Sequence, residues 1–290
     1  MDYNFGISFS ETAMHFALAR ENKIQSVERM VYPFSFSYSS MFEPQVFAEI
    51  TKMISEKITN YQVEGATLSI ALPMNFVHIK KIALPVLAEP ELVKQQVEWE
   101  LSNFLTEDIN NYKVLNTKVE FSVYNYREII FLAFKKEIVK HLSQMAETCS
   151  TSLKKVLPAQ YLLTDLIRNG GEGGQTAMVT KLEKTQISSQ LYIDGKYYYS
   201  YLDSTPLTDE ANTQTIYRLC KNRHAETKNT VSQLPFSKNQ ELKCFVYGDG
   251  FNIELETLFE KNFSEPVNKL SSDQKGKSDS GLEAVQVLLD

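Results

Sequence analysis

The sequence predicts an α/β protein built from two similar halves, and three observations support this fold class. Residues 5–9 and 14–18 alternate apolar and polar side chains on either side of a short polar turn, which is typical of a β-hairpin. A second hairpin of the same kind spans residues 177–202 and contains the strong two-residue turn Asp194-Gly195. Helical segments follow each hairpin. The repetition predicts a duplicated domain with a cleft between its halves.

Composition and charge exclude several classes of protein. The 290 residues are 43% hydrophobic and 23% charged, as in ordinary globular proteins, and the net charge of −6 argues against a nucleic-acid partner. The three cysteines and four histidines show no metal-ligand spacing, so we expect reduced thiols and no metal site. There is no signal peptide pattern and no apolar run of the roughly 20 residues that a membrane span needs. These features predict a cytoplasmic protein without a membrane span of its own.

The first half continues from its hairpin as an α/β layer. Residues 23–36 predict a further strand and a tyrosine- and serine-rich loop, and residues 67–72 predict a short apolar strand that is covered on both faces. Between them Pro44 begins a helix. Its apolar stripe comprises Phe47, Ile50, Ile54 and Ile58.

The middle of the chain predicts an inserted α+β subdomain at about residues 74–157. A strand at 76–84 precedes a helix that begins at Glu89-Pro90, and two strands at 113–123 and 128–134 precede a helix at 137–149. In the first of these helices the pattern predicts a buried stripe that Leu92 and Trp99 widen. The stripe itself comprises Val93, Val97, Leu101 and Phe104.

The second half is shorter. Pro158 begins a helix that ends at Gly170, and the glycine-rich run 169–175 predicts a flexible joint, since no Gly-Lys-Ser/Thr follows it as a phosphate loop requires. After the second hairpin we expect a helix at 208–220 that starts with Asp209 and Glu210, and then a polar, poorly patterned stretch at 221–240. The remaining expected elements are a strand at 242–247, a helix at 253–263, a polar loop at 271–280 and an apolar segment at 281–289 that packs back onto the body. The predicted halves are residues 1–170 and 171–290.

This order of elements, with its local motifs, resembles the actin-like superfamily and within it the PilM-like proteins of type IV pilus assembly, which are related to FtsA and to the cytoplasmic part of GspL. The motifs are two strands that end in proline, a Trp-Glu helix, and the strand and helix that close the insertion. They read Ala71-Leu72-Pro73, Ile82-Ala83-Leu84-Pro85, Glu98-Trp99-Glu100 and Phe134-Lys135-Lys136-Glu137-Ile138-Val139. The resemblance implies an actin-like, ribonuclease H-like duplicated domain with an inserted α+β subdomain. It also implies a groove between the first half and the insertion that takes a short N-terminal segment of the membrane partner PilN.

The nucleotide motifs of this superfamily are degenerate here. Actin-like ATPases hold Mg-ATP with two Asp-x-Gly turns, one in each hairpin, whose glycines let backbone N–H groups approach the phosphates. By position these turns are Ser8-Phe9-Ser10 and Thr180-Lys181-Leu182, so both carboxylates and both glycines are missing. A hydroxyl group cannot supply the charge that holds the metal.

A third motif survives as Gly248-Asp249-Gly250, which in the family lies beneath the adenosine and which also suits a plain strand-to-helix turn. The candidate nucleotide-pocket positions are Ser8, Ser10, Thr180, Gly248 and Gly250. We therefore predict no catalytic residue, no metal and no cofactor, with ATP and Mg²⁺ as the alternative.

The leading interpretation is a non-catalytic, pseudo-ATPase scaffold of the actin fold that binds a protein partner, such as the short N-terminal tail of an inner-membrane pilus or secretion component. Through that partner the protein would lie at the inner membrane, and a homo-oligomer is compatible with the fold. Two alternatives stay open. One is a working actin-like ATPase with unusual metal ligands, and the other is a bacterial actin-fold protein with no pilus role.

Overall fold

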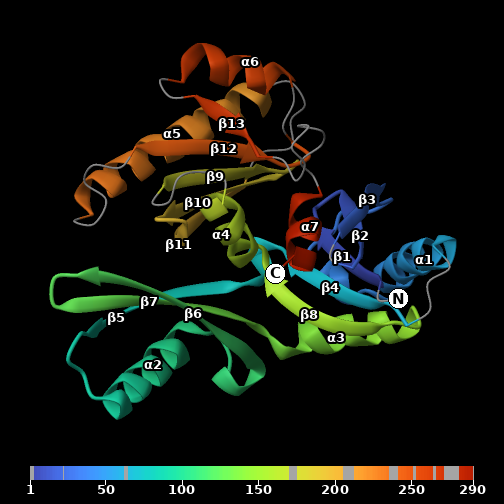
Figure 1. Ribbon diagram of the computed structural model, residues 1–290, viewed down its shortest axis with the longest axis horizontal. Helices are drawn as coiled ribbons and strands as arrows, with labels where there is room; N and C mark the ends of the chain where they lie inside the picture. The colour runs from blue at the N-terminus through green and yellow to red at the C-terminus, as the bar shows by residue number, and fades with distance from the viewer. Residues whose placement is uncertain are drawn as a thin grey trace.

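The computed structural model describes residues 3–21, 23–61, 65–169, 175–204, 212–234, 241–250, 253–263, 266–270 and 281–289 (Figure 1). Most of the predicted glycine-rich joint, the predicted helix start with Asp209 and Glu210, and the polar segment 271–280 lie outside these ranges. Within them the chain forms two five-stranded sheets and a separate three-stranded sheet, with helices against each.

The first sheet has the strand order β3-β2-β1-β4-β8 and contains the predicted N-terminal hairpin. Its first three strands form an antiparallel meander, and β4 and β8 then run parallel to β1. The bounds are β1 Tyr3–Phe9, β2 Ala13–Arg20, β3 Lys23–Val31, β4 Thr67–Leu72 and β8 Ser152–Pro158. The short polar segment 10–12 joins β1 to β2, as the alternation of apolar residues predicts.

The second sheet repeats this arrangement with the order β11-β10-β9-β12-β13. Again a three-stranded antiparallel meander is followed by two parallel strands. The bounds are β9 Thr176–Leu182, β10 Gln186–Ile193, β11 Lys196–Ser204, β12 Leu242–Tyr247 and β13 Val267–Lys269. Asp194 and Gly195 have φ of 51° and 69°, as a two-residue hairpin turn of type I′ requires. The matching strand orders confirm the predicted duplication, whereas β13 was not predicted.

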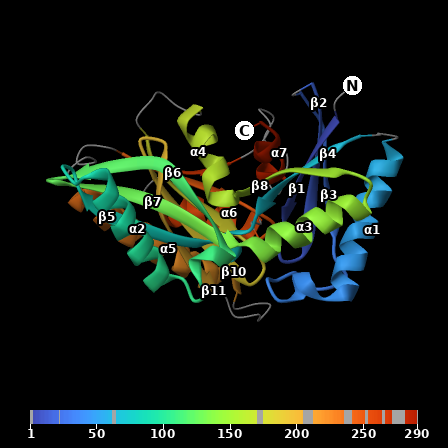
Figure 2. The ribbon, with the colours of Figure 1, turned by 90° about the horizontal axis from the view of Figure 1, so that it is seen from below.

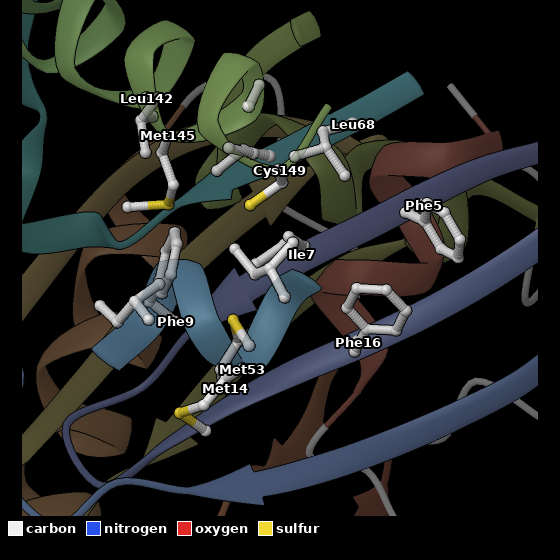
Figure 3. Packing of buried hydrophobic residues seen from close by; sticks show 14 of the residues in the cluster. Phe5, Ile7, Phe9, Met14, Phe16, Met53, Leu68, Leu142, Met145 and Cys149 are labelled. Carbon is white, nitrogen blue, oxygen red and sulfur yellow. The ribbon is translucent and has the colours of Figure 1, made fainter. Parts of the chain in front are cut away.

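Helices cover both faces of the first sheet. Phe5, Ile7 and Phe9 of β1 point toward α1 (Pro44–Asn60) and α3 (Lys136–Thr148), which supply side chains such as Met53 and Leu142 to the same core (Figure 3). The opposite face is covered by the C-terminal helix α7 (Leu282–Leu289), which packs against β1, β2 and β4. The apolar end of the chain therefore crosses back to the first half, as expected from its composition.

The helices of the second half are α5 (Asn212–Gln233) and α6 (Ile253–Asn262), whereas α4 (Ala159–Asn169) contacts strands of both halves. The prediction of a helix that ends near residue 220 is wrong, because α5 continues for three further turns. The buried positions of α5 keep helical spacing beyond residue 220, into the stretch that was expected to be irregular. Two of these positions are occupied by the polar residues His224 and Thr227, so the sequence does not show the apolar periodicity of a helix there. The complete buried series is Ile216, Cys220, His224, Thr227 and Val231.

The three-stranded sheet has the order β5-β7-β6 and is packed on both faces. One face, with Ile82 and Phe131, packs against α2, and the other, with Ile130 and Leu132, joins the core of the second half. The bounds are β5 His78–Pro85, α2 Pro90–Phe104, β6 Tyr112–Val123 and β7 Tyr126–Lys135. The predicted insertion at 74–157 is wider than this unit, because α3 and β8 pack with the first sheet.

The predicted buried stripe of α2 is only partly correct. Leu101 is buried, and Val93 and Val97 pack against the same cluster. Phe104, however, is 38% exposed and does not belong to the buried stripe. Leu92 and Trp99 do not widen this stripe, because 60% and 65% of their surfaces are exposed. The helix lies on the outside of the three-stranded sheet, and no element of the described ranges lies against its outer side (Figures 1 and 2). A second row of apolar side chains therefore has no core to enter.

The remaining short elements are the 3₁₀ turns η1 (Ser40–Phe42), η2 (Met74–Phe76) and η3 (Ile109–Asn111). Across the described ranges, no helix has both the length and the apolar character needed to cross a bilayer.

Candidate functional site

The two halves meet through Asp249, in the turn that follows β12. Its carboxylate lies within hydrogen-bonding distance of the Ser10 hydroxyl group, with 3.2 Å between Ser10 Oγ and Asp249 Oδ2. Arg29 Nε donates to the same oxygen at 3.1 Å, and His15 Nε2 lies 3.4 Å from Asp249 Oδ1. The partners come from the first hairpin and from β3, so one side chain of the second half contacts three of the first.

The electrostatics of this contact favour a charged Asp249. Burial alone would raise the pKa of its carboxyl group, but the close contact with His15 and the charge of Arg29 outweigh burial and lower the pKa to about 2. The carboxylate is therefore ionised at neutral pH, and it is already paired within the protein.

A second contact joins the two hairpin turns directly. Glu11, in the turn between β1 and β2, accepts a hydrogen bond from the backbone N–H of Thr185 at 3.0 Å. The Thr185 hydroxyl group donates to the same carboxylate oxygen. Because Thr185 lies in the turn between β9 and β10, the two equivalent hairpins of the duplicated fold are linked tip to tip.

A buried cluster of charges lies where the end of β9 meets α7. Lys181 of β9 donates from Nζ to Glu283 Oε2 of α7 at 3.0 Å and lies 3.3 Å from Glu183 Oε1. The Tyr247 hydroxyl group donates to Glu283 Oε1 at 2.8 Å. Burial would lower the pKa of Lys181, but the two carboxylates outweigh it and raise that pKa. The second of the two predicted phosphate turns thus contains an ammonium group that is neutralised inside the protein.

The two glycines of the third motif are explained by packing. Gly248 has φ of +108°, and a Cβ atom there would lie 2.4 Å from the carbonyl oxygen of Leu182. The backbone N–H of Gly250 donates to that same oxygen at 2.8 Å. Both residues therefore let the turn after β12 lie against the end of β9, which agrees with a strand-to-helix turn.

The five predicted pocket positions do not form one constellation. Ser10 contacts the Gly248–Gly250 turn through Asp249, whereas Thr180 lies inside the second sheet, with its Oγ1 3.4 Å from Ser189 Oγ. Ser8 is also buried, and within the described ranges its hydroxyl group has no hydrogen-bond partner. Arg29, Glu11 and Glu283 were not predicted.

The described residues around Ser10 and Glu183 leave little space for a ligand. The space between the halves that is lined by Ser10, Glu11, Phe76 and Glu183 has a volume of about 10 Å³, enough for about one water molecule. Ligand pockets typically have volumes of about 300–1,000 Å³. No group of three or more histidine, cysteine or acidic residues in the described ranges could hold a metal ion. The absence of nucleotide binding and the absence of catalysis both stay predictions.

A larger groove lies where the three-stranded unit meets the first half. It has a volume of about 290 Å³ and is lined by polar side chains of the segment between α2 and η3, of η3 itself, of the end of β7 and of the start of α3. Lys135 donates to Glu107 Oε1 at 2.5 Å, and Tyr38 of the first half donates to Glu137 Oε1 at 2.5 Å. Burial and the hydrogen bond to Glu137 raise the pKa of Tyr38 to about 12. The lining residues are Glu107, Asn110, Asn111, Lys135, Lys136 and Glu137.

The structure is similar to several solved structures. No family model matches the sequence, and a search of curated proteins gives no significant match. The PilM–PilN type IV pilus biogenesis complex superposes with a TM-score of 0.68 at 13% identity, over 99% of this chain and 97% of that chain. A Bacteroides thetaiotaomicron protein with an actin-like ATPase fold and unknown function gives a TM-score of 0.58 at 13% identity, over 99% and 95%.

The cytoplasmic domain of EpsL, an inner membrane component of the type II secretion system of Vibrio cholerae, gives a TM-score of 0.52 at 8% identity, over 99% of this chain and 92% of that chain. At these identities the similarity shows the fold. The chain has the actin-like fold, and the fold class predicted from the sequence is confirmed.

Proposed function

We propose that the protein is a non-catalytic scaffold of the actin fold that binds another protein. The observation that supports this function best is the junction between its halves. There Asp249 is paired with Arg29 and His15, and Lys181 is paired with Glu283. The charged side chains at this junction are thus satisfied by one another and do not need a ligand to balance them. A duplicated fold held closed in this way can present fixed surfaces to a partner without turning over a nucleotide.

The partner that the similarities support is a component of a pilus or secretion assembly. Two of the similar structures, the PilM–PilN complex and the EpsL cytoplasmic domain, come from such assemblies. The sequence resemblance adds the expectation of a short N-terminal tail that belongs to an inner-membrane protein. The scaffold would then be cytoplasmic and held at the inner membrane through that tail.

The groove between the three-stranded unit and the first half suits such a tail. Its side-chain amides, Asn110 and Asn111, can each donate and accept hydrogen bonds, as an extended peptide backbone requires. Lys136 is exposed and can bind an acidic side chain or a terminal carboxylate of a neighbouring segment. The volume of about 290 Å³ holds a few side chains, not a folded domain.

We expect a labelled peptide from the N-terminal tail of an inner-membrane protein encoded beside this gene to bind in a fluorescence anisotropy titration. Lys136→Glu should weaken that binding about tenfold, because it reverses a charge in the groove. Lys52→Glu, on the exposed side of α1, makes the same change elsewhere and should leave binding unchanged. Equal affinity in wild type and Lys136→Glu would contradict the groove as the site. Failure of every such tail to bind would contradict the adaptor function.

A further inference from the structure

The outer side of α2 exposes apolar side chains that no part of the described chain covers. Leu92 and Trp99 are 60% and 65% exposed, and Trp99 is the only tryptophan in the sequence. Leu87, in the turn that leads into the helix, is 94% exposed. Single exposed apolar residues are common, but three of this size along one short segment are typical of a binding surface.

The charged residues that directly precede the two apolar residues of the helix are both acidic. Glu91 and Glu98 are exposed, and each immediately precedes one of the two apolar residues, Leu92 and Trp99. We call these four residues, with the exposed Gln95 between them, the α2 outer face. It contains two carboxylates and no lysine or arginine. Lys94, the only basic residue of the helix, lies beside both glutamates, about 60° from Glu91 and 40° from Glu98 in helical rotation, but on the side away from Leu92, from which it is about 200° away at 100° per residue.

The spacing of these residues matches a helical partner. Leu92 and Trp99 are seven residues apart, and so are Glu91 and Glu98, which places each pair about 10.5 Å apart along the helix. In heptad terms the apolar pair takes position a and the acidic pair position g, with Gln95 at position d. Residues at g in such contacts pair with charged residues of the facing helix.

We propose that the α2 outer face binds a basic amphipathic helix of another protein. The apolar residues of that helix would pack against Leu92 and Trp99, and its lysine or arginine residues would pair with Glu91 and Glu98. This surface is separate from the polar groove near η3, so the two binding events can be tested independently.

Two other occupants fit the surface less well. A second copy of this chain brings two more carboxylates and no cation to the same face, so like charges would oppose one another. An anionic membrane surface attracts lysine and arginine and would be repelled by Glu91 and Glu98. A basic helix is the occupant that uses both the apolar and the acidic row.

Trp99 provides a direct signal for the test. The probe is a tryptophan-free peptide of three heptads with leucine at a and d and lysine at e and g, and its twin has glutamate in place of lysine. The basic peptide should shift the Trp99 emission saturably to shorter wavelength, as the indole leaves water, and the acidic twin should not. No shift at millimolar basic peptide, or equal shifts with both peptides, would overturn the proposal. So would a shift on neutral phosphatidylcholine vesicles of the size seen with the basic peptide.

Variants of the α2 outer face separate the contribution of its acidic residues to peptide binding from that of its apolar residues. The double variant Glu91→Gln/Glu98→Gln should weaken the basic peptide about fivefold, as expected for two exposed ion pairs. Glu56→Gln/Glu260→Gln removes the same charge from exposed positions on α1 and α6 and should have no effect. Leu92→Ser should weaken binding at least tenfold through lost apolar burial, with an unchanged melting temperature because the side chain is exposed. Unchanged affinity in the first variant or in Leu92→Ser would contradict the assignment.

Discussion

Replacing Lys181 with methionine should lower the free energy of unfolding by about 3–5 kcal/mol, the usual result of removing one partner from a buried ion pair. The Lys181 side chain is 11% exposed and is the only cation beside Glu183 and Glu283 among the contacts the structure describes. Methionine has a similar shape but leaves two carboxylates buried without a counter-charge. The loss is measurable by urea denaturation monitored by circular dichroism.

Two controls show whether charge is the cause. Glu283→Gln leaves Lys181 paired with Glu183 and should cost only about 1.5–3 kcal/mol, as for a hydrogen bond to a charged group. Lys52→Met, on the exposed side of α1, should change stability by less than about 0.5 kcal/mol. A smaller loss for Lys181→Met than for Glu283→Gln would contradict the role given to the ammonium group.

The stability of Lys181→Met should depend on pH in a distinctive way. Burial already raises the pKa of Glu183, and removal of Lys181 would raise it further. A carboxyl group whose pKa is higher in the folded state favours the folded state most when it is protonated. The deficit of Lys181→Met relative to wild type should therefore shrink as the pH falls from 7 toward 5. A deficit that stays constant over this range would show that lost packing, not charge, is responsible.

Gly6→Ala should be nearly as damaging, at about 3 kcal/mol or more, because it forces apart two packed backbones. A Cβ atom at Gly6 of β1 would lie 2.0 Å from the carbonyl oxygen of Ala284 in α7 and 2.8 Å from Leu288 Cγ. The helix has to move away from the sheet, which also separates Glu283 from Lys181. We expect a lower melting temperature and faster proteolytic removal of the C-terminal helix.

Gly65→Ala provides the comparison for this prediction. Gly65 has φ of +70°, but among the described residues no atom apart from its chain neighbours lies within 4 Å of the added Cβ, so only local strain of about 1 kcal/mol is expected. In Gly65→Ala the resistance of α7 to proteolysis should be the same as in wild type. If Gly6→Ala cost no more than Gly65→Ala, the close packing of α7 on β1 would be wrong.

The duplicated sheets could be predicted from the sequence because their signals are local. The alternation in β1 and β2 and the Asp194-Gly195 turn each depend on neighbouring residues. The length of α5 could not be predicted, because His224 and Thr227 occupy buried positions that are usually filled by apolar side chains. The exposure of Leu92 and Trp99 also escaped prediction, because an apolar residue on a helix is expected to find a core, and only tertiary packing shows that none is there.

The junction between the halves depends on contacts that are distant in sequence. Lys181 and Glu283 are 102 residues apart, and Ser10 and Asp249 are 239 apart. A signal was nevertheless present. Lys181 lies beside a run of apolar strand residues, and Glu283 is the only charged residue in the apolar segment 281–289. Two isolated charges of opposite sign in buried segments are expected to pair.

We expect the actin fold of this protein to work as a scaffold without a nucleotide. Isothermal titration calorimetry of ATP into the purified chain, with and without Mg²⁺, tests it most directly, together with thermal unfolding under the same conditions. We expect no heat of binding and no change in melting temperature at millimolar ATP. Saturable, Mg²⁺-dependent heat with a rise in melting temperature would contradict the claim and would favour the ATPase alternative.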